Sequence, residues 1–521
     1  MIVKNPVLKG FHPDSSMIYV DGTYYIANST FEYYPGVRIH KSTDLVRWQA
    51  LISPLSSRRL LDMTGNPAST GVWAPCLSYC DGKFYLVYSN MRSWDVGPFK
   101  DGSNFLITAT DLEGEWSDPV YLNSSGFDAS LFHDDDGKKY LINMEWNHLE
   151  RGKEQFSGIL LQEYDEKQRK CVGKVSKIFL GTVEPGCVEG PHLYKKDGWY
   201  YIFCAEGGTS YNHAEVVARS RSIFGPYEMH PLTHLLTTSG KDRINQKAGH
   251  ASMCEGKDGK WYIAYLTGRP LKDKRCVLGR ETSVQEIVWR DGWPYLLNGT
   301  NTPSDTFETD AQPYEPPKSI TYRFNDWKEL GDFQTLRNPL CEDNFRIHDG
   351  VLTVVGKESI VSAFDQSVLC RRQQHFRFTA ETLLEFNPES FQHMAGLIYR
   401  YNERNAYYLF MSVKPDTLEK ELRVLYLDNG NYEYSEPVAY DSTRVWLRLN
   451  VDGEEAQFSY SRNGITFVNI GKCADATIMS DECAGPMGGF TGAFVGMACQ
   501  DLRRHSKTAD FHYFRYENGE E

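Results

Sequence analysis

The segment Asp197-Gly198-Trp199-Tyr200-Tyr201-Ile202 joins an Asp-Gly turn to a short aromatic strand, and the same arrangement occurs four more times along the chain. Asp-Gly between apolar runs is typical of a β-hairpin, because both residues tolerate the positive φ that a tight turn requires. The other copies begin at Asp21, Asp81, Asp136 and Asp258. Their spacing is nearly constant: 60 residues from 21 to 81, 55 from 81 to 136, 61 from 136 to 197 and 61 from 197 to 258.

Five all-β units of this size predict a five-bladed β-propeller. Each unit is too small to bury its own apolar face, and stacking the units around an axis buries all of them. We assign residues 1–302 to this propeller. Two ordinary β-sandwiches whose Asp-Gly turns recur by chance are the alternative, and the near-constant spacing counts against them.

The repeat stops after Asn298, and the remaining chain divides into a linker and a second β domain. Residues 303–319 contain four prolines in a polar context, which is typical of a linker. Residues 320–521 contain short alternating strands and further Asp-Gly and Asn-Gly turns, so we predict a C-terminal β-sandwich. The predicted fold class is therefore all-β, a five-bladed propeller followed by a sandwich.

Charge and composition exclude several classes of function. The 521 residues carry 56 Lys and Arg against 69 Asp and Glu, a net charge of −13, whereas nucleic-acid and anionic-membrane binders need a basic face. No run approaches the roughly 18 apolar residues of a membrane helix. The twelve cysteines are scattered without a CxxC pair and indicate reduced structural thiols. The N-terminus shows no signal-peptide pattern, which favours the cytoplasm.

Ionisable residues stand at a near-constant distance before the Asp-Gly turns. Counting back seven or eight residues from each turn gives Asp14, Trp73, Asp128, Glu189 and His250. The innermost strand of each propeller blade lines the central channel, so we expect these positions at one axial level. Ionisable groups at a crowded axis are costly unless a solvated pocket uses them. The alternative is that each acid caps a turn or pairs with a surface arginine, and their common register counts against it.

Three carboxylates in an aromatic-lined pocket suit glycoside hydrolysis. One acid protonates the leaving oxygen and one carboxylate activates water, while the third sets a pKa or a position. Aromatic residues make up 13% of the chain and fit both β-structure and sugar stacking. No GxSxG elbow, P-loop or GxGxxG follows a strand in a usable context, so acyl and phosphoryl transfer lack support.

Three phrases of the sequence resemble glycoside hydrolase family 43: NPVLKGFHPDS at residues 5–15, GFDASLFH at residues 126–133 and VEGPH at residues 188–192. The similarity is greatest to the family's β-xylosidases with an added C-terminal sandwich, and it covers essentially the whole chain. The family is inverting, with a single displacement by water.

The resemblance implies a role for each polar candidate. Asp14 resembles the general base, Glu189 the general acid and Asp128 the carboxylate that orients the acid and raises its pKa. Arg280 resembles the arginine that hydrogen-bonds the sugar hydroxyls, with a surface ion pair as the alternative. His250 resembles the histidine at the pocket floor, where some members hold a divalent metal or an ordered water. The resemblance implies that the enzyme requires no cofactor. The ion it implies is a divalent cation, Ca²⁺ or Mg²⁺, near His250.

Aromatic residues complete the implied site. Three residues of this chain resemble the hydrophobic walls of the family's terminal sugar subsite: Phe31, Trp73 and Phe127. The family's sandwich domain sends an aromatic loop residue over the pocket, and Phe494 is the best match, with plain sandwich core as the alternative. Ser15 and Ala129 follow Asp14 and Asp128 at positions where the family commonly has proline. These differences bear on the local rigidity of the backbone rather than on the chemistry.

The predicted activity is that of an exo-acting, inverting β-1,4-xylosidase that releases xylose from the non-reducing end of short xylooligosaccharides. An α-L-arabinofuranosidase, or a bifunctional enzyme, is the nearest alternative, because the two sugars present similar hydroxyls. A sugar-binding propeller without catalysis is a third alternative. It is disfavoured because sugar binding needs only stacking and hydrogen bonds, whereas this chain has three carboxylates at one register. The expected partners are the xylooligosaccharide substrate and further copies of the chain in a homo-oligomer, with no nucleic acid and no membrane.

Overall fold

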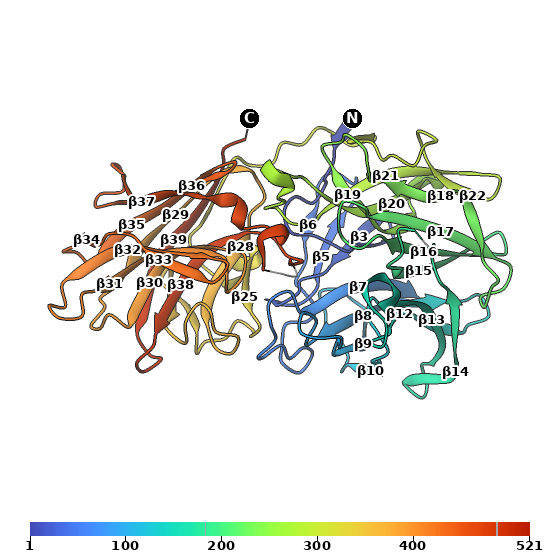
Figure 1. The fold of residues 1–521 in the computed structure, drawn as a ribbon, viewed down its shortest axis with the longest axis horizontal. Coiled ribbons are helices and arrows are strands. Elements are labelled where there is room, and N and C mark those ends of the chain that lie inside the picture. The colour runs from blue at the N-terminus through green and yellow to red at the C-terminus, as the bar shows by residue number, and fades with distance from the viewer. Residues whose placement is uncertain (183, 486–487, 521) are drawn as a thin grey trace.

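The computed structural model describes residues 1–182, 184–485 and 488–520, which form two β-rich lobes side by side (Figure 1). The N-terminal half winds into one lobe and the C-terminal part into the other, and both chain ends lie at the same edge. The helical elements of these residues are six short 3₁₀ turns: η1 (Gly152–Gln155), η2 (Lys257–Gly259), η3 (Lys272–Lys274), η4 (Trp327–Asp332), η5 (Ala476–Ile478) and η6 (Asp481–Cys483). The predicted all-β class is confirmed.

The first lobe is a five-bladed propeller in which each blade is a four-stranded antiparallel sheet. Blade 1 is β2 (Ser16–Val20), β3 (Thr23–Asn28), β5 (Arg38–Ser42) and β6 (Gln49–Ala50). Blade 2 is β7 (Gly71–Cys80), β8 (Lys83–Met91), β9 (Gly102–Ala109) and β10 (Val120–Asn123). Blade 3 is β11 (Ser130–His133), β12 (Lys139–Trp146), β13 (Phe156–Asp165) and β14 (Lys170–Phe179).

The last two blades follow the same plan. Blade 4 is β15 (Glu189–Lys196), β16 (Trp199–Glu206), β17 (Ala214–Ser220) and β18 (Glu228–Thr237). Blade 5 is β19 (Gln246–Glu255), β20 (Trp261–Gly268), β21 (Glu281–Arg290) and β22 (Trp293–Leu296). The first strands of the five blades contact one another in a closed ring, with β19 beside β2.

Apolar clusters between neighbouring blades hold this ring together. Ile39 of blade 1 and Leu86 of blade 2 belong to one buried cluster, and Tyr201 of blade 4 and Ile263 of blade 5 belong to another. Corresponding clusters lie at the other three blade contacts. Because every blade buries its two faces against its neighbours, the repeat is stable only as a ring.

The N-terminal segment closes the ring without completing a blade. Leu8 forms a bridge with Thr282 of blade 5, and the side chain of Asn5 exchanges two hydrogen bonds of 2.9 Å with the backbone of Val284. Further upstream, β1 (Ile2–Lys4) pairs with β23 (Thr306–Glu308), which lies inside the predicted linker. The proline-rich segment is thus tied to the N-terminus over part of its length.

The second lobe is a sandwich of two large antiparallel sheets. One contains β24 (Ser319–Tyr322), β26 (Phe345–His348), β27 (Val351–Val355), β29 (Arg377–Glu385), β35 (Arg444–Asp452), β36 (Glu455–Ser461), β37 (Val468–Asp475) and β39 (Thr508–Asn518). The other contains β25 (Phe333–Leu336), β28 (Ser367–Arg372), β30 (His393–Arg400), β31 (Ala406–Val413), β32 (Lys420–Asp428), β33 (Asn431–Tyr434), β34 (Val438–Ala439) and β38 (Phe494–Asp501). Their facing side chains form the largest apolar core of the molecule.

The two lobes share a sheet edge and a core. The short strand β4 (Tyr33–Tyr34) leaves blade 1 and pairs with β25 of the sandwich. One buried cluster contains Phe11 and Tyr33 of the propeller lobe together with Ile398 and Phe494 of the sandwich. The lobes therefore pack as one unit, and the sandwich can contribute to a site on the propeller.

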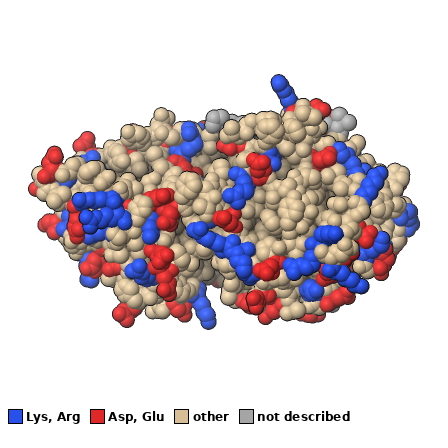
Figure 2. Space-filling view, turned by 90° about the horizontal axis from the view of Figure 1, so that it is seen from below, with Lys and Arg blue, Asp and Glu red and all other residues tan. Residues whose placement is uncertain are grey.

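Figure 2 shows one face of the molecule, on which acidic and basic side chains are interspersed over both lobes. Among the residues that the structure describes, no helix has the length and apolar character needed to cross a membrane.

Candidate active site

A left-handed residue interrupts the start of the innermost strand in every blade. Asp14, Ala74, Asp128, Gly190 and His250 all have φ between +32° and +57°, and each stands two residues before the regular ladder begins or resumes. In blades 2, 4 and 5 the pairing register shifts at this point, as expected for a β-bulge. Bulges of this kind redirect side chains, here at the mouth of the propeller axis.

This geometry corrects the predicted register by one residue in two blades. Trp73 and Glu189 were predicted to be equivalent to Asp14, but they stand one residue before the left-handed position, which Ala74 and Gly190 occupy. The error arises because hairpin length varies. Blades 1, 2 and 4 have two-residue Asp-Gly turns, whereas residues 134–138 and 256–260 connect the strands in blades 3 and 5.

One pocket of about 220 Å³ lies where these residues meet. It brings together eight of the nine predicted site residues, namely Asp14, Phe31, Trp73, Phe127, Asp128, Glu189, His250 and Arg280. It is also lined by residues that the sequence analysis did not assign to the site: Lys100, Phe156, Gly208, Thr209 and Phe490.

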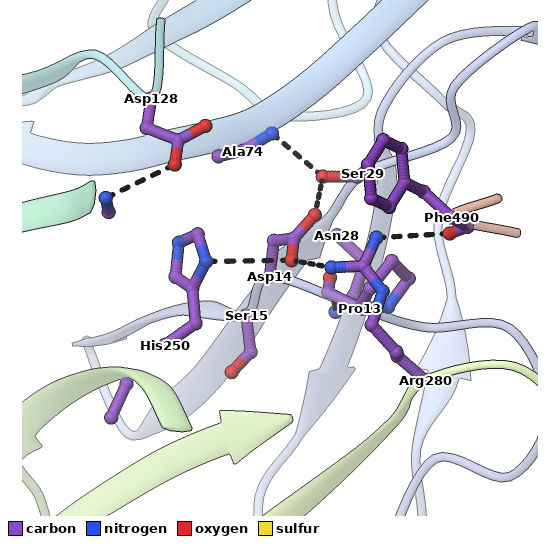
Figure 3. Close-up of polar contacts among 12 residues, drawn as sticks. Pro13, Asp14, Ser15, Asn28, Ser29, Ala74, Asp128, His250, Arg280 and Phe490 are labelled. Carbon is purple, nitrogen blue, oxygen red and sulfur yellow. Dashed lines mark hydrogen bonds and ion pairs between the residues drawn. The ribbon is translucent and has the colours of Figure 1, made fainter. Parts of the chain in front are cut away.

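Asp14 is held from three sides (Figure 3). Arg280 Nη1 donates to Asp14 Oδ1 at 2.6 Å, and His250 Nδ1 lies 3.5 Å from the same oxygen. The Ser29 hydroxyl donates to Oδ2 at 2.6 Å and accepts from the backbone N–H of Ala74 at 2.8 Å. Because Asp14 is only 4% exposed, these partners fix the orientation of its carboxylate at the base of the pocket.

Asp128 and Glu189 are linked through the backbone. The N–H of Gly190 donates to Asp128 Oδ2 at 3.1 Å, so Asp128 holds the residue that follows Glu189. Burial, reinforced by the negative charge of Asp14, raises the pKa of Glu189 to about 7, against the opposing charges of Arg280 and Lys100. Burial and the charges of Glu189 and Asp14 also raise the pKa of Asp128. The two carboxyls therefore retain a proton at a pH where an exposed pair would have lost it.

Aromatic rings enclose the acids. Trp73 packs edge-on against Phe127 with ring centroids 5.2 Å apart, and its indole N–H donates to the Ser69 carbonyl at 3.0 Å. Phe31 lies 5.9 Å from Trp73 and Phe490 lies 5.4 Å from it. Such walls favour the apolar faces of a sugar ring, and the carboxylates below can bind its hydroxyls.

Arg280 is an interior residue, not a surface one. It is 4% exposed, and besides Asp14 its guanidinium donates from Nη2 to the Phe490 carbonyl at 3.0 Å. The guanidinium carbon lies 5.3 Å from the centroid of the Phe31 ring. Arg280 thus joins the central carboxylate of the propeller to the loop of the sandwich domain.

The structure does not place Phe494 over the pocket. Phe494 is fully buried in β38, where it stacks on Tyr33 at 3.8 Å and meets the edge of Phe11. Phe490, four residues earlier, lines the pocket instead. A strand residue facing the shared core cannot reach the pocket mouth, whereas the loop before β38 can.

Two glycines allow that loop to pack closely against blade 5, because a side chain at either position would meet the backbone of the other segment. A Cβ on Gly279 would lie 2.2 Å from the Thr491 carbonyl oxygen, and a Cβ on Gly492 would lie 3.1 Å from the backbone N of Gly279. The N–H of Ala493 also donates to the Val277 carbonyl at 2.9 Å. This close crossing, beside Arg280, sets the position of Phe490. Its only sequence signal is the pair of glycines, which lie 213 positions apart (279 to 492).

Lys100 is the charged residue that the sequence analysis missed. Its ammonium lies 4.5 Å from the Trp146 ring centroid and donates to the Trp94 carbonyl at 3.3 Å. Burial lowers the pKa of Lys100 to about 8, against the attraction of Glu189. No repeat position or motif marks this residue, because it lies in a loop between β8 and β9.

The surroundings of His250 do not fit a divalent cation. The carboxylate oxygen 3.5 Å from its Nδ1 belongs to Asp14 and already accepts from the cationic Arg280. The other ring nitrogen faces Gly190, where an added Cβ would lie 2.7 Å from Nε2. Among the described residues no three His, Cys, Asp or Glu side chains converge as ligands. The predicted Ca²⁺ or Mg²⁺ near His250 therefore finds no protein ligand set among the described residues.

The sequence model of glycosyl hydrolases family 43 matches residues 3–294, the propeller with all three acids. The chain belongs to this family and is a glycoside hydrolase. Residues 321–517 match the β-xylosidase C-terminal concanavalin A-like domain. The resemblance stated from the sequence is thereby confirmed.

Full-length relatives support the same assignment. The chain is 46% identical to a xylosidase/arabinosidase 43B of Humicola insolens, over 99% of this chain and 97% of the relative. It is 43% identical to a β-xylosidase of Bacillus subtilis, over 99% of each. The crystal structure of a xylan β-1,4-xylosidase from Bacillus halodurans C-125 superimposes with a TM-score of 0.95 at 45% identity, covering 99% of this chain and all of that one.

Proposed function

We propose that this family 43 enzyme is an exo-acting, inverting β-1,4-xylosidase that removes xylose from the non-reducing end of short xylooligosaccharides. One observation carries the proposal. A carboxylate fixed by Arg280 and Ser29, Asp14, lines the same small pocket as Glu189, a carboxyl whose pKa of about 7 keeps it partly protonated at neutral pH. An inverting glycosidase needs a general acid of this kind together with a carboxyl group that activates water.

Each acid then has a distinct part in the reaction. Glu189 protonates the oxygen of the leaving sugar while Asp14 takes a proton from the water that attacks the opposite face of the anomeric carbon. Asp128 accepts the N–H of Gly190 and so holds the backbone next to Glu189 in place. His250 and Arg280 orient Asp14 and transfer no proton.

The size of the pocket supports exo action. Its volume of about 220 Å³ lies below the roughly 300–1,000 Å³ of pockets that bury drug-sized ligands, so it suits a single sugar unit rather than a chain passing through. Phe490 narrows it from the sandwich side and the acids close it from the propeller side.

The preference for xylose is supported by the relatives named as β-xylosidases. The name of the Humicola insolens relative, a xylosidase/arabinosidase, favours some α-L-arabinofuranosidase activity as the second candidate. Turnover of an aryl β-xyloside and an aryl α-L-arabinofuranoside by one preparation separates the two. β-1,4- and β-1,3-linked xylobiose compared in the same way test the linkage.

Stereochemistry tests the mechanism directly. NMR of the first-formed product of a β-xyloside should show α-xylose, and initial β-xylose would refute Asp14 as the base. The Asp14→Ala enzyme should lose at least about 10²–10⁴-fold in kcat, the usual contribution of general base catalysis. Wild-type turnover no higher than that of this variant would instead indicate a sugar-binding propeller.

Two further predictions concern the protein in the cell. We propose a homo-oligomer, on the resemblance alone, and light scattering measures its size. We also propose a cytoplasmic location, which the twelve free thiols of the structure favour because they suit a reducing compartment. Cell fractionation tests it.

A further inference from the structure

A second cavity of about 650 Å³ lies between the two lobes, behind the active site. Its walls come from the N-terminal segment, blade 1, the segment around Pro316 and the strands β28 and β39 of the sandwich. The segment Phe11–Asp14 separates the two cavities: His12 lines this one and Asp14 lines the catalytic pocket.

The cavity is strongly basic in a chain that is acidic overall. Among its described lining residues Asp332 is the only acid. Against it stand six cationic side chains, Lys4, Lys9, Arg38, Lys318, Arg371 and Arg372. The lining also includes three histidines, His12, His40 and His375. A cluster of one sign on a protein of net charge −13 points to a ligand of the opposite sign.

Three of these cations are buried and share one carboxylate. Arg38, Arg371 and Arg372 are 5%, 2% and 4% exposed. Arg38 lies 3.5 Å from Asp332. Arg371 donates to the Tyr322 hydroxyl at 2.8 Å, and Arg372 donates from Nε to the Phe11 carbonyl at 2.6 Å. Neutral oxygens orient these two guanidiniums, and among the described lining residues Asp332 alone offers a carboxylate to offset all three charges. Positive charge is therefore in excess here, which is costly in a buried setting.

Polar side-chain atoms in the same group lack partners. Within the described part of the chain, Nε of Arg38, Nε of Arg371, Nη2 of Arg372 and Nδ1 of His40 are buried and make no hydrogen bond. Most buried donors in folded proteins are paired, so three guanidinium N–H groups without partners, all in residues that line one cavity, call for an acceptor. An acceptor that also carries negative charge would satisfy both deficits at once.

Burial and the excess positive charge lower the pKa values of two neighbouring histidines. Burial and the positive charge of Arg372 and Arg38 lower the pKa values of His12 and His40 well below the ordinary range, so both rings are neutral. Their ring centroids lie 4.9 Å apart. The histidines therefore add hydrogen-bonding atoms to the cavity but no further charge.

We propose that this cavity binds a small organic molecule bearing a phosphate or several carboxylates, held by Arg38, Arg371 and Arg372. Its volume falls within the roughly 300–1,000 Å³ of ligand pockets and leaves room for more than an inorganic oxyanion. Trp48, Tyr314 and Tyr516 line it as well and offer contacts for an organic body. The half-buried Lys9 and the exposed Lys318 would steer the anion to the site.

Calorimetric titration of the full-length enzyme with inorganic phosphate and with citrate tests this, using sodium chloride at matched ionic strength as the reference. We expect saturable binding at one site per chain, and the stronger of the two probes shows whether a phosphate or a polycarboxylate is preferred. Bound ligand should also raise the Tm, since it stabilises only the folded state. No heat and no Tm shift beyond those of chloride would overturn the proposal.

Variants locate the site. Arg372→Gln and Arg371→Gln remove the positive charge but keep an N–H donor, for the Phe11 carbonyl and the Tyr322 hydroxyl respectively. Each variant should weaken anion binding at least about tenfold, as expected for loss of a charge-assisted pair. Lys241→Gln removes the same charge from an exposed position outside the cavity and should leave binding unchanged. Should the arginine variants not fold, the lysine variants Lys9→Gln and Lys318→Gln should slow association and reduce its salt dependence.

Xylose distinguishes this cavity from the catalytic pocket, where Arg280 is also a cation. Anion binding that persists in saturating xylose and depends on Arg371 and Arg372 supports the proposal. Binding that xylose abolishes, or that ignores both arginines, would place the anion at Arg280 and refute it. Because the readout is binding rather than turnover, the result is independent of which glycoside the enzyme cleaves.

Discussion

The ring of His250 packs so closely on Gly190 that a Cβ at that glycine would lie 2.7 Å from His250 Nε2. Gly190 also donates its N–H to Asp128 and directly follows Glu189. One backbone unit therefore connects the left-handed positions of blades 3, 4 and 5, which are Asp128, Gly190 and His250. Since His250 in turn faces Asp14, the positions of all three acids depend on a residue without a side chain.

Gly190→Ala should lower kcat/KM by about 10²-fold, because a displacement of roughly 1 Å in a catalytic group has an effect of that size. The added methyl would push His250 away from Gly190 and disturb Asp14. Gly82→Ala is the matched control: its φ of +76° carries a similar backbone strain, but nothing lies within 4 Å of the added Cβ. Steady-state kinetics and Tm are measured for both. Equal losses of activity in the two variants would show that strain alone is responsible.

The raised pKa of Glu189 should make the enzyme less stable as the pH rises from about 4.5 to about 7. In this window the folded state keeps the proton that the unfolded state releases, so stability falls with pH and the loss is complete above 7. Glu189→Gln removes this effect. Relative to wild type its free energy of unfolding should be similar near pH 5 and higher at pH 8, by on the order of 2–3 kcal/mol.

Thermal unfolding of both proteins between pH 5 and pH 8 measures this difference. Glu436→Gln, at an exposed position, should follow the wild-type curve throughout. A constant difference between Glu189→Gln and wild type across the range would mean that Glu189 ionises as an exposed acid does, and its part as the general acid would lose its basis.

Substitution of Phe490 should weaken substrate binding, whereas substitution of Phe494 should lower the stability of the fold. Phe494→Ala empties a fully buried position and should cost about 3–5 kcal/mol of stability. Phe490→Ala removes a half-buried pocket wall, so it should raise KM for xylobiose about tenfold or more with little change in Tm. Denaturant unfolding and steady-state kinetics on the same two variants separate the effects. A larger loss of substrate binding in Phe494→Ala would restore that residue to the site.

A structural feature could be predicted from the sequence where adjacent residues create it, and could not where distant segments of the chain do. The blades could be predicted because an Asp-Gly hairpin such as Asp21-Gly22 is specified by adjacent residues, with φ of +48° and +84°. The register of the acids was predictable only to within one residue. The Asp-Gly pair used for counting is the whole hairpin loop after Glu189, whereas after Asp128 it lies inside the longer loop of residues 134–138.

Phe490 and Lys100 could not be found in this way. Phe490 reaches the pocket because its loop crosses blade 5 at Gly279, a contact between distant segments that no local pattern records. Lys100 is held among Trp146 and Trp94 by a loop conformation, without a repeat position to mark it. The pairing of β4 with β25 has the same character, because two-residue strands leave no alternation in the sequence.

His250 should position Asp14 without taking part in proton transfer. Burial and the charge of Arg280 lower its pKa, against the attraction of Asp14, so the ring stays neutral over the range in which the enzyme titrates. His250→Asn should therefore lower kcat by about 10²-fold while both limbs of the pH–rate profile keep their apparent pKa values. His213→Asn is the control: this buried ring bonds to the Lys247 carbonyl at 2.8 Å and does not line the pocket. The control should change kcat little. Disappearance of one limb in His250→Asn alone would identify the histidine as a group that titrates in catalysis, and the assignment of acid and base to Glu189 and Asp14 would have to be revised.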